Sequence, residues 1–123
     1  VRGVFALGGR QAGGRMGNGD DPWTVALINL IRNALQAVEG QEDGIVRVDT
    51  CAGATGHLLI IITDNGPGIP PERLSAIFTP FFSTKSGGSG IGLPISQRIM
   101  QLHGGQLSVS SIPNVRTEFR MEF

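Results

Sequence analysis

Cysteine is nearly absent from this chain, which carries Cys51 as its only thiol among 123 residues. A lone cysteine excludes an internal disulfide and also excludes metal clusters built from paired cysteines. We expect an inert thiol in a turn or in the core, because no basic neighbour is evident that would favour the reactive thiolate. The composition fits a reducing, cytoplasmic setting.

An excess of charge is absent as well, because the chain contains 10 basic and 10 acidic residues and has no formal net charge. A nucleic-acid-binding surface or a polybasic membrane-binding surface would need an excess of Lys and Arg. We therefore expect no nucleic acid and no membrane contact for this domain. No uninterrupted apolar run approaches the roughly 20 residues that span a bilayer, and no signal-peptide pattern opens the chain.

An initiating methionine is missing too, since the chain begins with Val1, and we expect it to be a piece of a longer protein. A length of 123 residues suits one domain with a single core. We expect residues 1–20 to be a flexible, glycine-rich N-terminal segment or vector-derived residue, with a short strand at the opening as an alternative for its first residues. The domain itself is expected over residues 21–123.

Glycine, by contrast, is abundant, and the 19 glycines stand in discrete groups with apolar runs between them. The first group follows the apolar run of residues 58–63 and reads Asp64-Asn65-Gly66-Pro67-Gly68-Ile69. We predict that a buried strand ends here and that Gly66 and Gly68 let the backbone approach a ligand closely. Asp64 can accept a hydrogen bond from an exocyclic amine, which adenine has. The pattern therefore predicts a base-reading site.

A second glycine group reads Gly88-Ser89-Gly90-Ile91-Gly92-Leu93 and stands directly before a predicted helix. The helix is predicted over residues 93–102 because Ile95, Ile99 and Leu102 recur at helical period. A glycine-rich turn at a helix N-terminus can hold phosphate, since free N–H groups and the positive end of the helix dipole point at the anion. Unrelated nucleotide folds and plain tight turns share this pattern, so both interpretations stay open at this point.

Two asparagines lie on one flank of a predicted helix that begins at Asp21-Pro22. A solvated polar face is the ordinary interpretation of such a flank, but asparagine is a mediocre helix former for that purpose. Amide oxygens suit Mg²⁺ that also keeps water and phosphate ligands, so Asn29 and Asn33 are a candidate metal and phosphate site. The polar flank consists of Asn29, Arg32, Asn33 and Gln36, and the apolar stripe of Leu27, Leu30, Ala34 and Val38, broadened by Ile31 and Leu35.

A short helix is predicted over residues 70–78, with its apolar residues facing inward, and a loop follows it. Phe81 or Phe82 either pins this loop to the core or packs over a base or against a partner. Thr84 and Lys85 suggest a mobile lid that brings a hydroxyl and a cation to terminal phosphates, with a solvated lysine as the alternative.

The remaining segments alternate apolar and polar residues, as half-buried strands do. Strands are predicted over residues 45–50, 57–63, 106–111 and 117–123, with turns over residues 51–56 and 112–116. Four strands and two main helices, joined by antiparallel hairpins, predict the α+β class and a two-layer α/β sandwich.

Taken in order, these motifs resemble those of the catalytic, ATP-binding domain of two-component sensor histidine kinases, in the superfamily shared with gyrase, the Hsp90 chaperones and mismatch-repair ATPases. Residues 29–34 are similar to the N box, 64–68 to the G1 box, 78–82 to the F box and 88–93 to the G2 box. The similarity covers residues 21–123 and is greatest to the nitrogen-regulation subgroup. It implies a Bergerat-type ATP-binding fold, in which helices cover one face of a mixed, mostly antiparallel sheet.

The resemblance also implies that the domain binds ATP with Mg²⁺, and it gives a role to each matching position. Asn33 is the implied metal ligand, and Asn29, Asn33 and Lys85 are the implied catalytic residues. Asp64 is implied to read the adenine amine. The other positions implied to bind the nucleotide are Gly66, Gly68, Ile69, Phe81, Thr84, Gly88, Ser89, Gly90, Ile91, Gly92, Leu93 and Thr117.

The reaction implied by the resemblance is transfer of the γ-phosphoryl group to a histidine of a separate dimerisation and phosphoacceptor domain of the same parent protein, with a response regulator as the further partner. Hydrolytic relatives carry a glutamate as general base one turn before the metal asparagine. Asn29 occupies that place here and cannot accept a proton at neutral pH. The chain has no His-Glu-x-x-x-x-Pro acceptor box, and His57 and His103 are poor acceptor candidates.

Two other functions are alternatives to phosphoryl transfer. A non-catalytic nucleotide-binding regulatory module would bind ATP only to change the order of the lid and the affinity for a partner. A hydrolysing ATPase is disfavoured by Asn29. We expect a cytoplasmic domain, whether or not the parent protein is anchored in a membrane.

Overall fold

The computed structural model describes residues 4–9, 22–52, 57–79 and 92–123. Among the described residues no helix has the length and apolar character that crossing a membrane requires. The elements in chain order are β1 (Val4–Gly9), α1 (Pro22–Ala37), β2 (Ile45–Ala52), β3 (Leu58–Asp64), α2 (Pro71–Leu74), α3 (Gly92–Leu102), β4 (Gln106–Ile112) and β5 (Arg116–Glu122).

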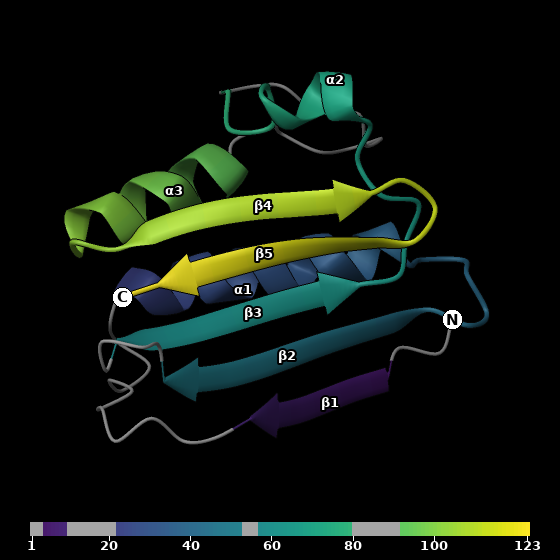
Figure 1. The fold of residues 1–123 in the computed structure, drawn as a ribbon, viewed down its shortest axis with the longest axis horizontal. Helices are drawn as coiled ribbons and strands as arrows, with labels where there is room; N and C mark the ends of the chain where they lie inside the picture. The colour runs from purple at the N-terminus through teal and green to yellow at the C-terminus, as the bar shows by residue number, and fades with distance from the viewer. Residues whose placement is uncertain (1–3, 10–21, 53–56, 80–91) are drawn as a thin grey trace.

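The strands form one mixed, mostly antiparallel sheet in the order β1-β2-β3-β5-β4 (Figure 1). β1 is parallel to β2, whereas every other neighbouring pair is antiparallel. The alternative of a short opening strand is confirmed by β1. A parallel neighbour requires a crossover connection, and α1 lies in the segment that links β1 to β2.

Strand ends differ from the predicted ones by one or two residues. Cys51 and Ala52 belong to β2 and not to a turn, because they pair with Leu59 and Leu58 of β3. Pairing between strands, which local alternation does not record, decides where a strand ends.

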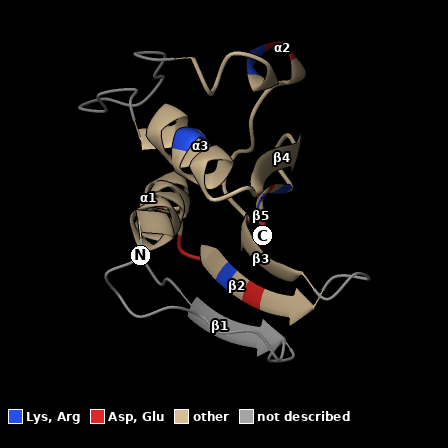
Figure 2. Ribbon diagram, turned by 90° about the vertical axis from the view of Figure 1, so that its left-hand side faces the viewer, with Lys and Arg blue, Asp and Glu red and all other residues tan. Residues whose placement is uncertain are grey.

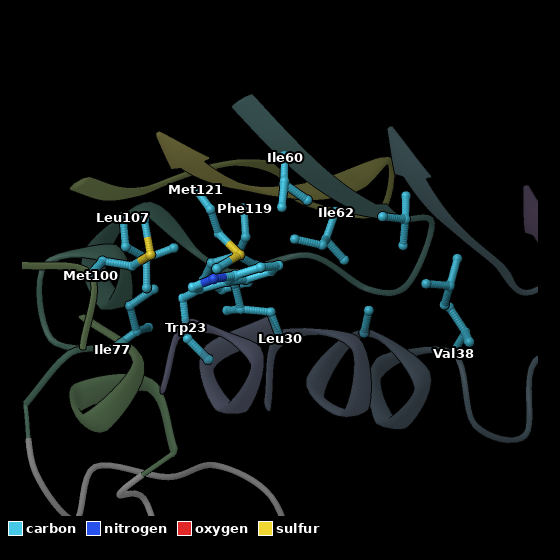
Figure 3. Packing of buried hydrophobic residues seen from close by; sticks show 14 residues of the cluster. Trp23, Leu30, Val38, Ile60, Ile62, Ile77, Met100, Leu107, Phe119 and Met121 are labelled. Carbon is cyan, nitrogen blue, oxygen red and sulfur yellow. The ribbon is translucent and has the colours of Figure 1, made fainter. Parts of the chain in front are cut away.

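Helices α1 and α3 lie on the same face of the sheet and form a second layer, as predicted for a two-layer sandwich (Figure 2). The core fills the space between the layers, and Figure 3 shows Trp23 and Leu30 of α1 directed toward the sheet. The Trp23 ring meets the Phe123 ring edge-on, with centroids 5.5 Å apart. The buried hydrophobic residues are Trp23, Ala26, Leu30, Ala34, Val38, Val46, Val48, Ile60, Ile62, Ile77, Met100, Leu107, Phe119 and Met121.

The opposite face of the sheet carries charged side chains. Arg47 pairs with Asp49 at 3.0 Å on β2, and Arg120 pairs with Glu118 at 3.2 Å on β5. Exposed pairs of this kind contribute little to stability. Among the strands whose side chains are described, the helix-covered face is thus mostly apolar, and the other face carries these charged pairs.

The apolar residues that recur along two of the helices are not all buried. Ile95 and Leu102 of α3 are 43% and 69% exposed, whereas Ser96 and Met100 are fully buried. Helix α3 packs against both α1 and β4, so the residues that point between these neighbours are buried, whatever the apolar period along the helix suggests. On α1, Leu35 is 37% exposed.

The predicted helix over residues 70–78 is shorter than expected. Only α2 is helical, and residues 75–78 form turns. The inward orientation of its apolar residues is confirmed at Ile77, which is buried, and at Phe78, which packs against the core.

Candidate functional site

Asp64 is the last residue of β3, which lies between β2 and β5. Its side chain is 3% exposed, and its Oδ1 accepts a hydrogen bond from the backbone N–H of Gly66 at 2.9 Å. In the strand register Asp64 stands opposite Val46 of β2 and Thr117 of β5. Directly paired residues share a face, and Val46 belongs to the core, so the Asp64 carboxylate points to the helix-covered face.

The loop that follows Asp64 runs directly against the end of α1. A Cβ built on Gly66 would lie 2.7 Å from the carbonyl oxygen of Ala37 and 3.0 Å from its Cβ. Backbone atoms cannot move aside as a flexible side chain can, so only glycine fits here. The sequence predicted that Gly66 lets the backbone approach a ligand; the close approach seen among the described residues is to α1, and the approach to a ligand stays a prediction.

Gly68 is confined on the other side of the loop by the turn between β4 and β5. Its φ is +78°, and an added Cβ would lie 2.8 Å from Pro113 Cα and 2.9 Å from the carbonyl oxygen of Ile112. Both the left-handed backbone and the lack of space require glycine. The N–H of Asn114 donates to the carbonyl oxygen of Pro67 at 2.7 Å. The loop is therefore held between α1 and the β4–β5 turn.

Asn65 fastens the same loop to the segment between α1 and β2. Its Oδ1 accepts the N–H of Ile45 at 2.6 Å, and its Nδ2 donates to the carbonyl oxygen of Asp43 at 2.8 Å. Its carbonyl oxygen accepts Gln41 Nε2 at 2.9 Å. Asn65 was given no role from the sequence, because the partners of its side chain lie 20 and 22 positions away in the chain.

Ser111 of β4 joins the loop to β5. Its Oγ accepts the N–H of Ile69 at 2.8 Å, donates to the carbonyl oxygen of Arg116 at 3.0 Å, and lies 3.0 Å from Thr117 Oγ1. Thr117 is 4% exposed and is the strand partner of Asp64. The structure thus brings together three predicted site residues, Asp64, Ile69 and Thr117, and adds Ser111 to them. Local alternation gave no signal of this role, because Ile69 and Ser111 lie 42 positions apart.

Asn29 and Asn33 are both half-buried on α1. Asn29 Nδ2 donates to Ser96 Oγ of α3 at 3.3 Å, and Ser96 Oγ donates to the carbonyl oxygen of Gly92 at 2.8 Å. At Asn29 the polar flank of α1 is therefore not simply a solvent-exposed face. It contacts α3, the helix that follows the second glycine group. Ser96, like Ser111, was not predicted from the sequence to contribute to the site.

Part of the predicted site lies outside the described residues. Gly92 and Leu93 are described, and they begin α3. No group of three or more His, Cys, Asp or Glu side chains in the described part of the chain could hold a metal ion. A metal at Asn33 would instead use the amide oxygen together with water and phosphate oxygens. The predicted residues that lie outside are Phe81, Thr84, Lys85, Gly88, Ser89, Gly90 and Ile91.

The chemistry of the described residues fits an adenine nucleotide. Asp64 and Thr117 place acceptor oxygens side by side on paired strands, which suits an exocyclic amine. The N-terminus of α3 supplies backbone N–H groups that lack intrahelical partners, which suits phosphate. Asn29 meets this same helix, so an amide side chain is available beside those N–H groups.

Comparison with known proteins gives a consistent result. Residues 20–123 match the family of histidine kinase-, DNA gyrase B- and HSP90-like ATPases. The chain is 44% identical over 92 residues to the sensor histidine kinase ZraS of Salmonella typhimurium. This alignment covers 75% of this chain and 19% of that protein. It is 40% identical over 101 residues to the sensory histidine kinase/phosphatase NtrB of Vibrio alginolyticus. That alignment covers 75% of this chain and 29% of that protein. The chain thus corresponds to a minor part of the length of these relatives.

Solved structures are similar over nearly the whole chain. The nucleotide-free catalytic domain of the histidine kinase ThkA superposes with a TM-score of 0.82 at 29% identity, covering 98% of this chain and 78% of that one. Full-length ShkA in complex with AMPPNP superposes with a TM-score of 0.83 at 26% identity, covering 98% of this chain and 25% of that one.

Proposed function

This chain belongs to the family of histidine kinase-, DNA gyrase B- and HSP90-like ATPases, and from this premise we propose that it binds Mg-ATP as the catalytic domain of a protein-histidine kinase. The γ-phosphoryl group passes to a histidine of a separate phosphoacceptor domain of the same parent protein, and a response regulator receives it next. We place this reaction in the cytoplasm, where ATP is available. The observation that carries the proposal is the buried carboxylate of Asp64 beside Gly66, Gly68 and Thr117.

In this proposal the adenine end of ATP binds at the loop after β3. Asp64 accepts a hydrogen bond from the adenine amine, and Thr117 lies on the paired strand beside it. Gly66 and Gly68 shape the loop, and Ile69 ends it. The close packing of the loop against α1 and against the β4–β5 turn supports a base pocket whose shape exists before the nucleotide arrives.

The phosphate end is assigned to α1 and to the start of α3. Asn33 offers its amide oxygen to Mg²⁺, and Asn29 contacts phosphate. Bound Mg²⁺ would neutralise charge on the phosphates during transfer. The glycine group of residues 88–92, of which only Gly92 is described, is assigned to bind the phosphates through its backbone N–H groups. Lys85, Thr84 and Phe81, outside the described residues, belong to the same proposal as parts of a lid.

Phosphoryl transfer needs mainly positioning and neutralisation of charge. An imidazole nitrogen of the acceptor histidine attacks the γ-phosphorus, the bond from that phosphorus to the bridging oxygen breaks, and ADP leaves. Asn29 stands where hydrolytic relatives carry a general base, and an amide cannot take a proton from water. This substitution disfavours hydrolysis and leaves the γ-phosphoryl group for a protein nucleophile.

Calorimetric titration with a non-hydrolysable ATP analogue, with and without Mg²⁺, tests the nucleotide site. We expect Mg²⁺-dependent binding by the wild-type chain and a loss of at least about tenfold in affinity for Asn33→Ala, because a metal ligand is removed. Gln36→Ala is the matched control, since Gln36 is exposed and lies nearly one turn further along α1. A folded wild-type chain that binds no nucleotide would contradict the proposal.

A phosphotransfer assay with γ-labelled ATP and the phosphoacceptor domain of the parent protein tests the enzymatic part. Label on the acceptor histidine is the expected result. Mg²⁺-dependent binding without transfer would instead favour the non-catalytic regulatory module, whereas rapid release of labelled phosphate without an acceptor would favour a hydrolysing ATPase.

A further inference from the structure

A single hydroxyl group, that of Ser111, connects the loop after Asp64 with β5. Its Oγ accepts the N–H of Ile69 at 2.8 Å, donates to the carbonyl oxygen of Arg116 at 3.0 Å, and lies 3.0 Å from Thr117 Oγ1. A Cβ built on Gly68 would lie 3.1 Å from the same oxygen. The loop therefore packs directly on Ser111 as well as bonding to it.

The direction of these hydrogen bonds follows from the chemistry of a hydroxyl, which has one hydrogen to donate and two positions that accept. The carbonyl of Arg116 can only accept, so it takes the hydrogen of Ser111. The N–H of Ile69 fills one acceptor position of Ser111. The hydrogen between Ser111 and Thr117 then comes from Thr117, and its hydroxyl can only accept from any further group.

The direction of the Thr117 hydrogen bond matters because Thr117 lies next to Asp64 in the sheet. Its side chain is 4% exposed, and its strand partner is Asp64. Directly paired residues share a face, so a carboxylate and an acceptor-only hydroxyl stand side by side. A ligand atom that hydrogen-bonds to either group must therefore be the donor.

We propose that Ser111 is a positioning residue that makes the site selective for 6-aminopurines over 6-oxopurines by fixing the Thr117 hydroxyl as an acceptor. This inference rests on the proposed nucleotide-binding function and deepens it. Adenine presents an amine at position 6, which donates. Hypoxanthine presents a carbonyl oxygen there, which would meet two acceptors, and buried groups left unpaired in this way discriminate strongly between ligands.

The test compares ADP with IDP, which differ at position 6 of the purine and in the proton on N1. Both are titrated calorimetrically, with Mg²⁺, into the wild-type chain and into Ser111→Ala. Alanine removes the oxygen that takes the Thr117 hydrogen, so the Thr117 hydroxyl can turn and donate to the carbonyl of IDP. We expect the ratio of the IDP Kd to the ADP Kd to fall at least about threefold.

Ser110→Ala is the matched control, because Ser110 is the exposed neighbour on the same strand and points to the other face of the sheet. It should leave the ratio unchanged. An unchanged ratio in Ser111→Ala, or equal losses for the two ligands, would overturn the inference, because a purely structural role weakens both alike. A folded wild-type chain that does not bind ADP would overturn the proposed function and the inference with it.

Thr117→Val provides a second variant in case Ser111→Ala does not fold. Valine has nearly the shape of threonine and lacks the hydroxyl, so the ratio should fall by a similar factor. A preserved ratio in Thr117→Val would show that the Thr117 hydroxyl does not read position 6, which overturns the inference independently of Ser111.

Discussion

The carboxylate of Asp64 has a structural partner in the backbone N–H of Gly66, at 2.9 Å from its Oδ1. Asparagine keeps an acceptor oxygen for that N–H but carries an amide in place of the charged group. We therefore predict that Asp64→Asn folds and binds ATP about ten- to a hundredfold more weakly, as expected for loss of a hydrogen bond to a charged group. Affinity for GTP should change far less, because guanine has no amine at position 6.

Competition titrations with ATP and GTP on the wild-type chain and on Asp64→Asn measure this difference. Circular dichroism provides the control that both proteins are folded. Equal losses for the two nucleotides would remove Asp64 from the adenine contact.

Gly66 shows how little space the loop leaves beside α1. An added Cβ would lie 2.7 Å from the carbonyl oxygen of Ala37, so Gly66→Ala must move backbone. We predict a decrease of about 1–3 kcal/mol in the free energy of unfolding, the usual cost of overpacking. Urea unfolding followed by circular dichroism measures it. Gly92→Ala is the control, because a Cβ there meets no atom within 4 Å among the described residues, and its stability should not decrease.

At the scale of elements, a hydrogen bond joins α1 and α3, the two helices to which the phosphate end of the candidate site is assigned. Asn29 of α1 donates to Ser96 of α3 at 3.3 Å, and Ser96 donates to the carbonyl oxygen of Gly92 at 2.8 Å. The single hydrogen of Ser96 is thus used within α3, so its oxygen can only accept from Asn29. This arrangement turns the Asn29 Nδ2 toward α3 and its Oδ1 away from Ser96.

We predict that Ser96→Ala weakens binding of Mg-nucleotide about two- to fivefold, because the Asn29 amide loses the group that orients it. Thermal stability should change little, since alanine is small and favours helix. Calorimetry on both single variants and on the double variant with Asn29→Ala measures the coupling. The effect of Ser96→Ala should disappear when Asn29 is already alanine, and a fully additive double variant would contradict the link.

The β4–β5 hairpin is a second element-scale feature. Asn114 adopts a left-handed backbone, with φ of 64°, and its N–H reaches the carbonyl oxygen of Pro67 at 2.7 Å. Asparagine tolerates this backbone better than most residues. The hairpin can therefore turn here without glycine and still support the loop after β3.

At the scale of the whole molecule, the candidate site is assembled where the two layers meet. The loop after β3 packs between the end of α1 and the β4–β5 turn. Helix α3 joins α1 through Ser96. The adenine end of the proposed ligand therefore depends on the sheet and its hairpin, whereas the phosphate end depends on the pair of helices.

Local pattern was sufficient to predict much of this architecture. The apolar run before Asp64 predicted a buried strand, and β3 ends at that residue. The 3.6-residue period of a helix placed Asn29 and Asn33 on one flank of α1, where both are half-buried. The end of this strand and the placement of the two asparagines each depend only on residues close together in the sequence. For that reason the motifs and the α+β class could be predicted without coordinates.

Tertiary structure alone decided the rest. It put β5 between β3 and β4, buried Met100 in place of Ile95, and set Gly66 against α1. It also joined Ile69 to Ser111 across 42 positions and Asn29 to Ser96 across 67. The physical reason is the same in each case: these contacts form between segments far apart in the chain, and the periodicity of one segment carries no information about which face of another segment it will meet.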